Sequence, residues 1–303
     1  MHVLHSLVRP FKPKLVSSGI TYPAGSQQLT THAKAQKTCR INGRRVDGIY
    51  VYDLERPAPS GQHVRRRVYY FAGGGWQAPP SSQHWTFCAE ICQKVPDTAV
   101  SVVSHPLAPN SPAATTIPQL MVFYKSILQQ ATEAKETVIL AGDSSGGNIV
   151  LSLVLHTLMQ DPQVPRPHAI LAICPAVDLQ PMKNEKPYSD VVKNDPILTL
   201  DSHNQEAAQW AADVDPAMPW ISPINADVSV LAKSSIRLFG VTAGYDILSP
   251  DALSFRDRCE EAGVTGEWLH WERQMHCFPL AFMYGLRESV QSKDWILEKI
   301  SSV

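Results

Sequence analysis

An apolar run at residues 138–141 leads into Gly142-Asp143-Ser144-Ser145-Gly146-Gly147-Asn148, and an apolar helical pattern follows at once. Small residues on both sides of Ser144 let a strand and a helix approach closely, and they permit a turn that holds the serine in a strained backbone conformation. The helix N-terminus then directs amide donors and a positive dipole toward its side chain. A Gly-x-Ser-x-Gly sequence between strand and helix is typical of an activated nucleophile, so we predict this role for Ser144.

Short apolar runs alternate with longer helical patterns along most of the chain. Runs rich in β-branched and aromatic residues predict strands at 68–71, 99–103, 137–141, 169–174, 236–242 and 267–271. Helical patterns predict helices at 82–94, 117–130, 146–159, 250–261 and 286–300. Buried strands joined by crossover helices indicate an α/β fold with a mostly parallel central sheet and helices on both faces. Two weaker runs, 37–41 and 48–52, flank Asn42-Gly43 and a basic turn, and predict an antiparallel hairpin at the sheet edge.

Two segments interrupt this alternation. At 303 residues, the chain can bury a large core within one domain. Residues from about 1 to 35 are punctuated by proline and serine, and residues 176–234 form a long excursion that contains a helical pattern at 202–212. Structureless loops of that length are uncommon in compact domains. We therefore predict a single domain over 1–303, with cap elements from both segments covering one end of the sheet.

Composition excludes several classes of partner. The net charge of −1, from 27 basic and 28 acidic side chains, gives no global field that would recruit nucleic acid. No stretch of 18 apolar residues could span a bilayer, and the N-terminus lacks the apolar run of a signal peptide, so we expect a cytoplasmic location. The six cysteines lack metal-site spacing, which favours packed, reduced thiols and no metal or other cofactor.

A second glycine-rich segment, Gly73-Gly74-Gly75, follows the strand predicted at 68–71 and Ala72. Three consecutive glycines are unfavourable in an ordered segment, because each loses much conformational entropy on ordering. A flexible surface loop is one interpretation. The other is a backbone that curls so that its N–H groups converge on one point, where they would stabilise the negative oxygen formed when a serine attacks a carbonyl.

The two glycine motifs, in this order, resemble those of the hormone-sensitive-lipase branch of the α/β-hydrolases. That branch carries His-Gly-Gly-Gly and Gly-Asp-Ser-Ala-Gly-Gly-Asn, and the segment 104–110 is similar to its Tyr-Arg-Leu-Ala-Pro-Glu. The resemblance covers roughly residues 67–300. It implies the α/β-hydrolase fold with a cap over the active site, and oxyanion donors from the amides of Gly74, Gly75 and Ser145. The chain departs from the pattern at Ala72, where the family has a histidine that braces the loop.

A serine nucleophile needs a histidine base and a carboxylate that orients it, in the chain order Ser, acid, His for this fold. His276 follows the last predicted strand in a segment that resembles the family's His-Gly-Phe, with Cys277 in place of Gly. Asp246 lies after the strand at 236–242, where the resemblance places the acid; Asp251 is the alternative, although its position suits a helix cap. Because only a neutral imidazole accepts the proton, we expect activity to rise with pH through a pKa of about 6–7.

These residues predict a serine esterase that cleaves a small or medium carboxylic ester through an acyl-enzyme, with an acetyl ester as one candidate substrate. Two alternatives stay open: an inert ligand-binding protein on the same scaffold, and a non-hydrolytic enzyme for acyl transfer, lyase or cyclisation chemistry in a biosynthetic pathway. Trp76, Trp210 and Trp220 either line the substrate pocket or pack in the core. The sequence does not determine the natural substrate or the oligomeric state.

Overall fold

The computed structural model describes residues 20–57 and 64–303. Of the N-terminal cap segment predicted at about 1–35, residues 1–19 lie outside this description. Its strands are β1 (Arg40–Val46), β2 (Ile49–Glu55), β3 (Arg66–Phe71), β4 (Thr98–Ser104), β5 (Thr137–Asp143), β6 (Ala169–Ile173), β7 (Arg237–Tyr245) and β8 (Gly266–Met275). They form one sheet in the order β1-β2-β4-β3-β5-β6-β7-β8. Pairing is parallel from β4 through β8 and antiparallel at β1 and β2, which confirms the predicted sheet.

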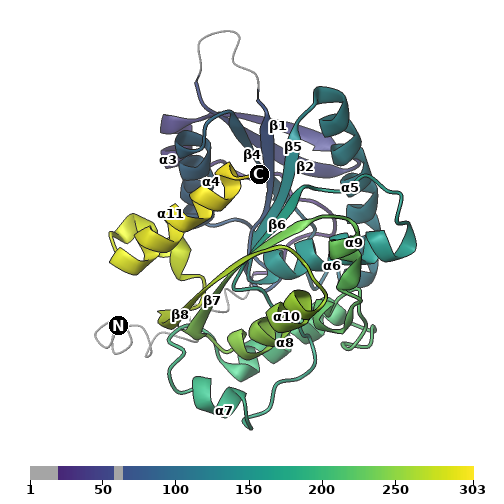
Figure 1. Ribbon diagram of the computed structural model, residues 1–303, viewed down its shortest axis with the longest axis vertical. Helices are drawn as coiled ribbons and strands as arrows, with labels where there is room; N and C mark the ends of the chain where they lie inside the picture. Colours follow the sequence, from purple (N-terminus) through teal and green to yellow (C-terminus); the bar gives the residue numbers. More distant parts are fainter. Residues whose placement is uncertain (1–19, 58–63) are drawn as a thin grey trace.

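Helices cover both faces of this sheet (Figure 1). One face carries α5 (Ala113–Ala134), α6 (Ser145–Gln160) and α10 (Ser249–Glu261), and the other carries α3 (Ala33–Thr38), α4 (Ser82–Lys94) and α11 (Arg287–Ser301). Successive strand residues point to opposite faces, so Tyr69 and Phe71 join the core on the α5–α6 side while Val68 and Tyr70 join the core under α4. Each central strand is buried on both sides, which explains its continuous apolar sequence.

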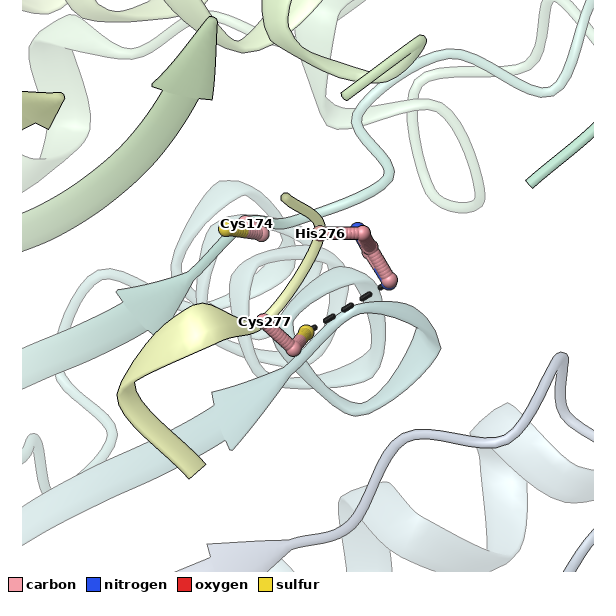
Figure 2. A group of neighbouring side chains, drawn as sticks. All are labelled: Cys174, His276 and Cys277. Atoms are coloured by element: carbon pink, nitrogen blue, oxygen red, sulfur yellow. Dashed lines mark hydrogen bonds between the residues drawn. The ribbon is translucent and has the colours of Figure 1, made fainter. Parts of the chain in front are cut away.

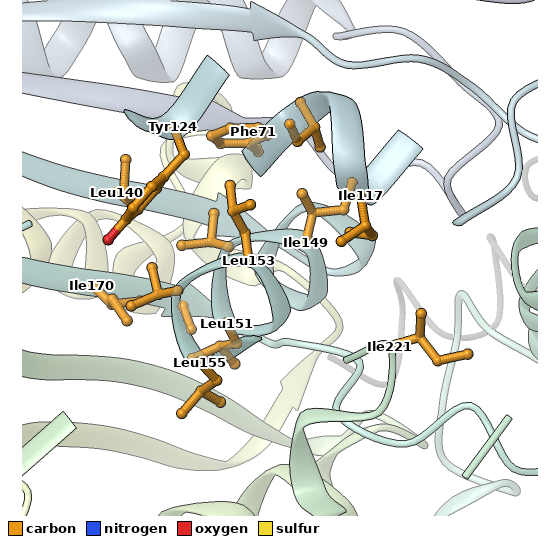
Figure 3. Close-up of a cluster of buried hydrophobic side chains, with 14 of the residues drawn as sticks. Phe71, Ile117, Tyr124, Leu140, Ile149, Leu151, Leu153, Leu155, Ile170 and Ile221 are labelled. Carbon is orange, nitrogen blue, oxygen red and sulfur yellow. The ribbon is translucent and has the colours of Figure 1, made fainter. Parts of the chain in front are cut away.

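The helix after the serine is buried along most of its length. Figure 3 shows Ile149, Leu153 and Leu155 of α6 packed beside Leu140 of β5 and Ile170 of β6. This packing fixes the angle at which α6 leaves β5 and thereby the position of the turn that holds Ser144.

The edge hairpin exists, but its predicted boundaries were wrong. β1 runs through Asn42-Gly43 and pairs with β2 from Arg40↔Glu55 to Val46↔Ile49, so the turn is at Asp47-Gly48. Both turn residues have positive φ, 46° and 84°, which is the backbone that a two-residue hairpin requires. Asn42-Gly43 and Asp47-Gly48 are equivalent turn signals in the sequence, and the pairing of β1 with β2 determines which of them forms the turn. Lys37, predicted in the first strand, belongs to α3.

The excursion between β6 and β7 is structured. It contains α7 (Tyr188–Val191), α8 (Leu200–Ala211), a 3-10 turn η2 (Pro223–Asn225) and α9 (Ser229–Lys233). A second 3-10 segment, η3 (Phe278–Tyr284), precedes α11. The segment before α3 is tied to the sheet as well, because Ser26 Oγ donates to the Ser104 carbonyl at the end of β4. None of the helices in residues 20–57 and 64–303 combines the length and the apolar composition that a membrane-spanning helix needs.

Candidate active site

Ser144 occupies a strained turn between β5 and α6. Its backbone has φ 53° and ψ −123°, a conformation that L-residues rarely adopt. The glycines around it are required by contact: a Cβ on Gly142 would lie 2.5 Å from the Gly146 backbone, and a Cβ on Gly146 would lie 2.0 Å from the Phe71 carbonyl oxygen. The strain therefore presents the serine hydroxyl at the carboxyl end of the sheet, directly above the N-terminus of α6.

The glycine loop lies against this turn. A Cβ on Gly73 would be 2.8 Å from Ser144 Cβ, so the loop passes immediately beside the serine. Gly74 and Gly75 have φ of 136° and 60°, which favour glycine, and the Gly74 carbonyl accepts from the amides of Gln77 and Ala78. Among the described residues, the amides of Gly74 and Gly75 donate no hydrogen bond. They are thus free to bind an oxygen.

Asp143, the residue before the serine, braces the loop. Its buried carboxylate accepts hydrogen bonds from Tyr70 Oη at 2.7 Å, Gly73 N at 3.0 Å and His84 Nε2 at 3.2 Å. Ser81 N donates to His84 Nδ1, so the ring proton is on Nε2 and points at Asp143. Burial alone would raise the pKa of Asp143, but its electrostatic interaction with His84 and these hydrogen bonds lower it.

This brace was missed in the sequence. Ala72 is fully buried, and the support that the family histidine would give comes here from Asp143, Tyr70 and His84. A local signal existed, because His84 occupies the third position of α4 and forms its capping box with Ser81. The sequence offered no signal for the contact between His84 and Asp143, since 59 residues separate them.

Asp246 and His276 form a buried hydrogen-bonded pair. His276 Nδ1 donates to Asp246 Oδ2 at 2.8 Å, and the aspartate is fully buried. Burial lowers the pKa of His276, but the charge and hydrogen bond of Asp246 outweigh it and raise the pKa above the ordinary histidine value. Asp251, the alternative acid, instead accepts from Tyr188 Oη at 2.9 Å. The structure therefore favours Asp246 over Asp251 as the partner of His276.

A cap carboxylate fixes the loop that carries Asp246. Asp195 Oδ2 accepts from Ile247 N at 2.9 Å, while its Oδ1 accepts from the amides of Ile197 and Leu198. Burial, followed by the charge of Asp246, raises the pKa of Asp195 to about 6. Asp195 thus joins the cap segment to the turn that orients the histidine.

His276 lies next to two thiols (Figure 2). Its Nε2 is 3.4 Å from Cys277 Sγ, and the ligand atoms of Cys174, His276 and Cys277 all lie within 4.8 Å of one another. Burial raises the pKa of Cys277 well above its usual range, so its sulfur is a neutral thiol at pH 7. The sequence predicted no metal site; these three groups are the ones in the described structure that could hold a metal ion.

The Cys277 sulfur links the histidine to the serine turn. It lies 3.6 Å from Asp143 Oδ2 and 4.0 Å from the Ile173 carbonyl oxygen, which also accepts from Ser144 N at 2.8 Å. His276 and Ser144 are therefore brought to the same end of the sheet. Within the described residues, the serine hydroxyl makes no hydrogen bond to His276; such bonds are often long without substrate and tighten in the reacting complex.

The three predicted pocket tryptophans do not lie together. Trp76 and Trp210 are almost completely buried and stack with ring centroids 6.0 Å apart, which packs α8 onto the glycine loop. Trp220 packs on His156 of α6 instead. Contact of any of them with a substrate stays a prediction, which a structure with a covalent inhibitor on Ser144 will test.

Comparison with known proteins gives a family. The model of the Abhydrolase_3 family, described as alpha/beta hydrolase fold, matches residues 68–280, well over half of the chain. The matched range contains the glycine loop, the serine turn, Asp246 and His276.

Individual relatives share about a quarter or less of their sequence with this chain. LipR of Mycobacterium tuberculosis is 26% identical over 286 residues, covering 92% of this chain and 87% of LipR. An esterase of Acinetobacter venetianus is 24% identical, covering 80% of this chain and 78% of its own length. Among solved structures, an esterase from the bacterial hormone-sensitive lipase family superposes with a TM-score of 0.79 at 19% identity, covering 99% of this chain and 98% of that one. The similarity to this solved structure shows a shared fold.

Proposed function

The chain belongs to the α/β-hydrolase fold family, and we propose that it hydrolyses small or medium carboxylic esters with Ser144, His276 and Asp246 as its catalytic triad. His276 accepts the proton of the Ser144 hydroxyl through Nε2 as the oxygen attacks the ester carbonyl. Asp246, bonded to Nδ1, keeps the ring in the tautomer that leaves Nε2 unprotonated and stabilises the imidazolium that forms.

The glycine loop stabilises the tetrahedral intermediate. The amides of Gly74 and Gly75, together with that of Ser145 at the start of α6, donate to the oxyanion. His276 then returns the proton to the departing alcohol, which leaves the acyl group on Ser144. Water attacks the acyl-enzyme by the same route, with His276 again as the base.

One observation carries this proposal: the strained Ser144 turn and the buried Asp246–His276 pair lie at the carboxyl end of the sheet, beside a glycine loop whose Gly74 and Gly75 amides donate to no described residue. Strain, burial of a charged pair and unpaired donors each cost stability. Their coincidence at one place is expected of a site that performs acyl transfer.

Turnover of p-nitrophenyl acetate and p-nitrophenyl butyrate, together with labelling by a fluorophosphonate, tests the proposal. The wild-type chain should hydrolyse at least one ester and become labelled, and Ser144→Ala should abolish both while circular dichroism shows an intact fold. Labelling without turnover would contradict hydrolysis and favour a non-hydrolytic acyl chemistry. Absence of both would favour a ligand-binding protein.

Matched aspartate variants test the choice of acid. Asp246→Asn should lower kcat by about four orders of magnitude, because the amide favours the wrong histidine tautomer. Asp251→Asn removes the same charge from a carboxylate that contacts Tyr188, and it should leave kcat unchanged. Equal losses in the two variants would contradict the assignment.

A further inference from the structure

One face of the cap helix α8 lies over the glycine loop. His203, Glu206 and Trp210 follow one another at helical spacing on this face. The Trp76 ring, directly after Gly75, packs against both His203 and Trp210 with centroid distances of 6.3 and 6.0 Å. These contacts place Glu206, between the two aromatic groups, above the loop.

The Glu206 carboxyl group touches the loop itself. A Cβ added to Gly75 would lie 2.4 Å from both Cδ and Oε2 of Glu206. The carboxyl group therefore fills the space that a side chain at position 75 would occupy. Gly75 supplies one of the two loop amides assigned to the oxyanion, so an acidic group lies beside the place where negative charge develops.

This carboxyl group has no protein partner. Across residues 20–57 and 64–303, the Glu206 side chain forms no hydrogen bond and no ion pair, although it is half-buried. Burial raises the pKa of Glu206 to about 7, and within the described part of the chain His276 is the side chain whose charge acts against this rise. An unpaired acidic group of this kind costs stability unless something binds it.

An ionised carboxylate next to the oxyanion opposes the transition state by like-charge repulsion. A cation bound between them removes this repulsion and pairs the buried carboxylate in the same step. The substrate is the molecule that enters this space during the reaction. We propose that Glu206 is a specificity subsite that selects esters with a cationic ammonium group near the scissile carbonyl; this inference rests on the esterase function proposed above.

Two acetyl esters of the same shape test the subsite. Acetylcholine carries a permanent positive charge, and 3,3-dimethylbutyl acetate replaces its nitrogen by carbon. The quantity measured is the ratio of kcat/KM for the charged ester to kcat/KM for the neutral one, so changes that affect both esters cancel. Glu206→Gln should lower this ratio by about tenfold, the size expected for one partly buried charge pair. The loss should appear mainly in KM.

Asp201→Asn is the matched control, because it makes the same change at an exposed position on the same helix. It should keep the wild-type ratio. An equal ratio in wild-type and Glu206→Gln proteins, with turnover of the neutral ester, would overturn the subsite and leave the esterase function standing. If the wild-type protein hydrolysed neither acetyl ester and neither p-nitrophenyl ester, the esterase function itself would be contradicted.

Discussion

Asp143 Oδ1 accepts a hydrogen bond from Gly73 N at 3.0 Å, so the residue that precedes the nucleophile also holds the first glycine of the oxyanion loop. Tyr70 and His84 also donate to this buried carboxylate, and the Cys277 thiol lies 3.6 Å from its Oδ2. The side chain next to the serine in the chain therefore positions the loop. The arrangement explains how the loop is ordered without a histidine at position 72.

Asp143→Asn should weaken this brace. The amide oxygen at the Oδ1 position can still accept from Gly73 and Tyr70, but its NH2 group at the Oδ2 position then meets the His84 donor, which leaves buried groups unpaired at a cost of about 1–3 kcal/mol each. We expect a lower melting temperature and a fall in kcat of about 10–100-fold, less than the loss of a whole oxyanion donor. Steady-state kinetics and thermal unfolding check this; unchanged kcat would show that the loop does not depend on Asp143.

Ala72→His would introduce the histidine that the hormone-sensitive-lipase branch carries before its glycines. Ala72 is completely buried, so an added ring overpacks the core and should destabilise the fold by about 1–3 kcal/mol. No gain in kcat/KM is expected, because Asp143 already supports the loop. Denaturant unfolding measures the first effect, with Ala72→Ser as a small-volume control. Retained stability with a faster rate would contradict this account.

The pH profile should reflect the buried histidine. Protonated His276 cannot act as the base, so kcat/KM rises as pH passes through the His276 pKa. Asp246 raises that pKa, which shifts the rise above the ordinary value of about 6.5 and above the range of about 6–7 expected from sequence. In Asp246→Asn, the residual activity should rise at lower pH, because the group that raises the His276 pKa most has lost its charge while burial still lowers it. A wild-type midpoint at or below 6.5 would count against the pair.

Trp210→Ala tests whether the cap depends on the tryptophan stack. Trp210 is fully buried against Trp76, so its truncation should lower the free energy of unfolding by about 3–5 kcal/mol. Trp220→Ala, at a half-buried position beside His156, should cost less. Chemical unfolding compares them. If Trp210→Ala changed only KM, the residue would belong to a substrate pocket instead.

Local sequence determined the parts of this protein that depend on neighbouring residues. The strand, serine turn and helix around Ser144 are continuous in the chain, so their geometry follows from small residues and apolar periodicity alone. The same holds for the alternation that yields the parallel sheet. The position of His276 after the last strand follows from chain order in the fold.

Tertiary structure decided everything that depends on which distant groups meet. Asp246 and Asp251 are both acidic residues near the same strand end, and only the fold placed one against His276 and the other against Tyr188. No sequence signal indicated that His84 would meet Asp143 or that Glu206 would meet Gly75, because the two members of each pair are remote in the chain. Such contacts are set by the packing of whole helices and strands, so residue type and local spacing alone do not predict them.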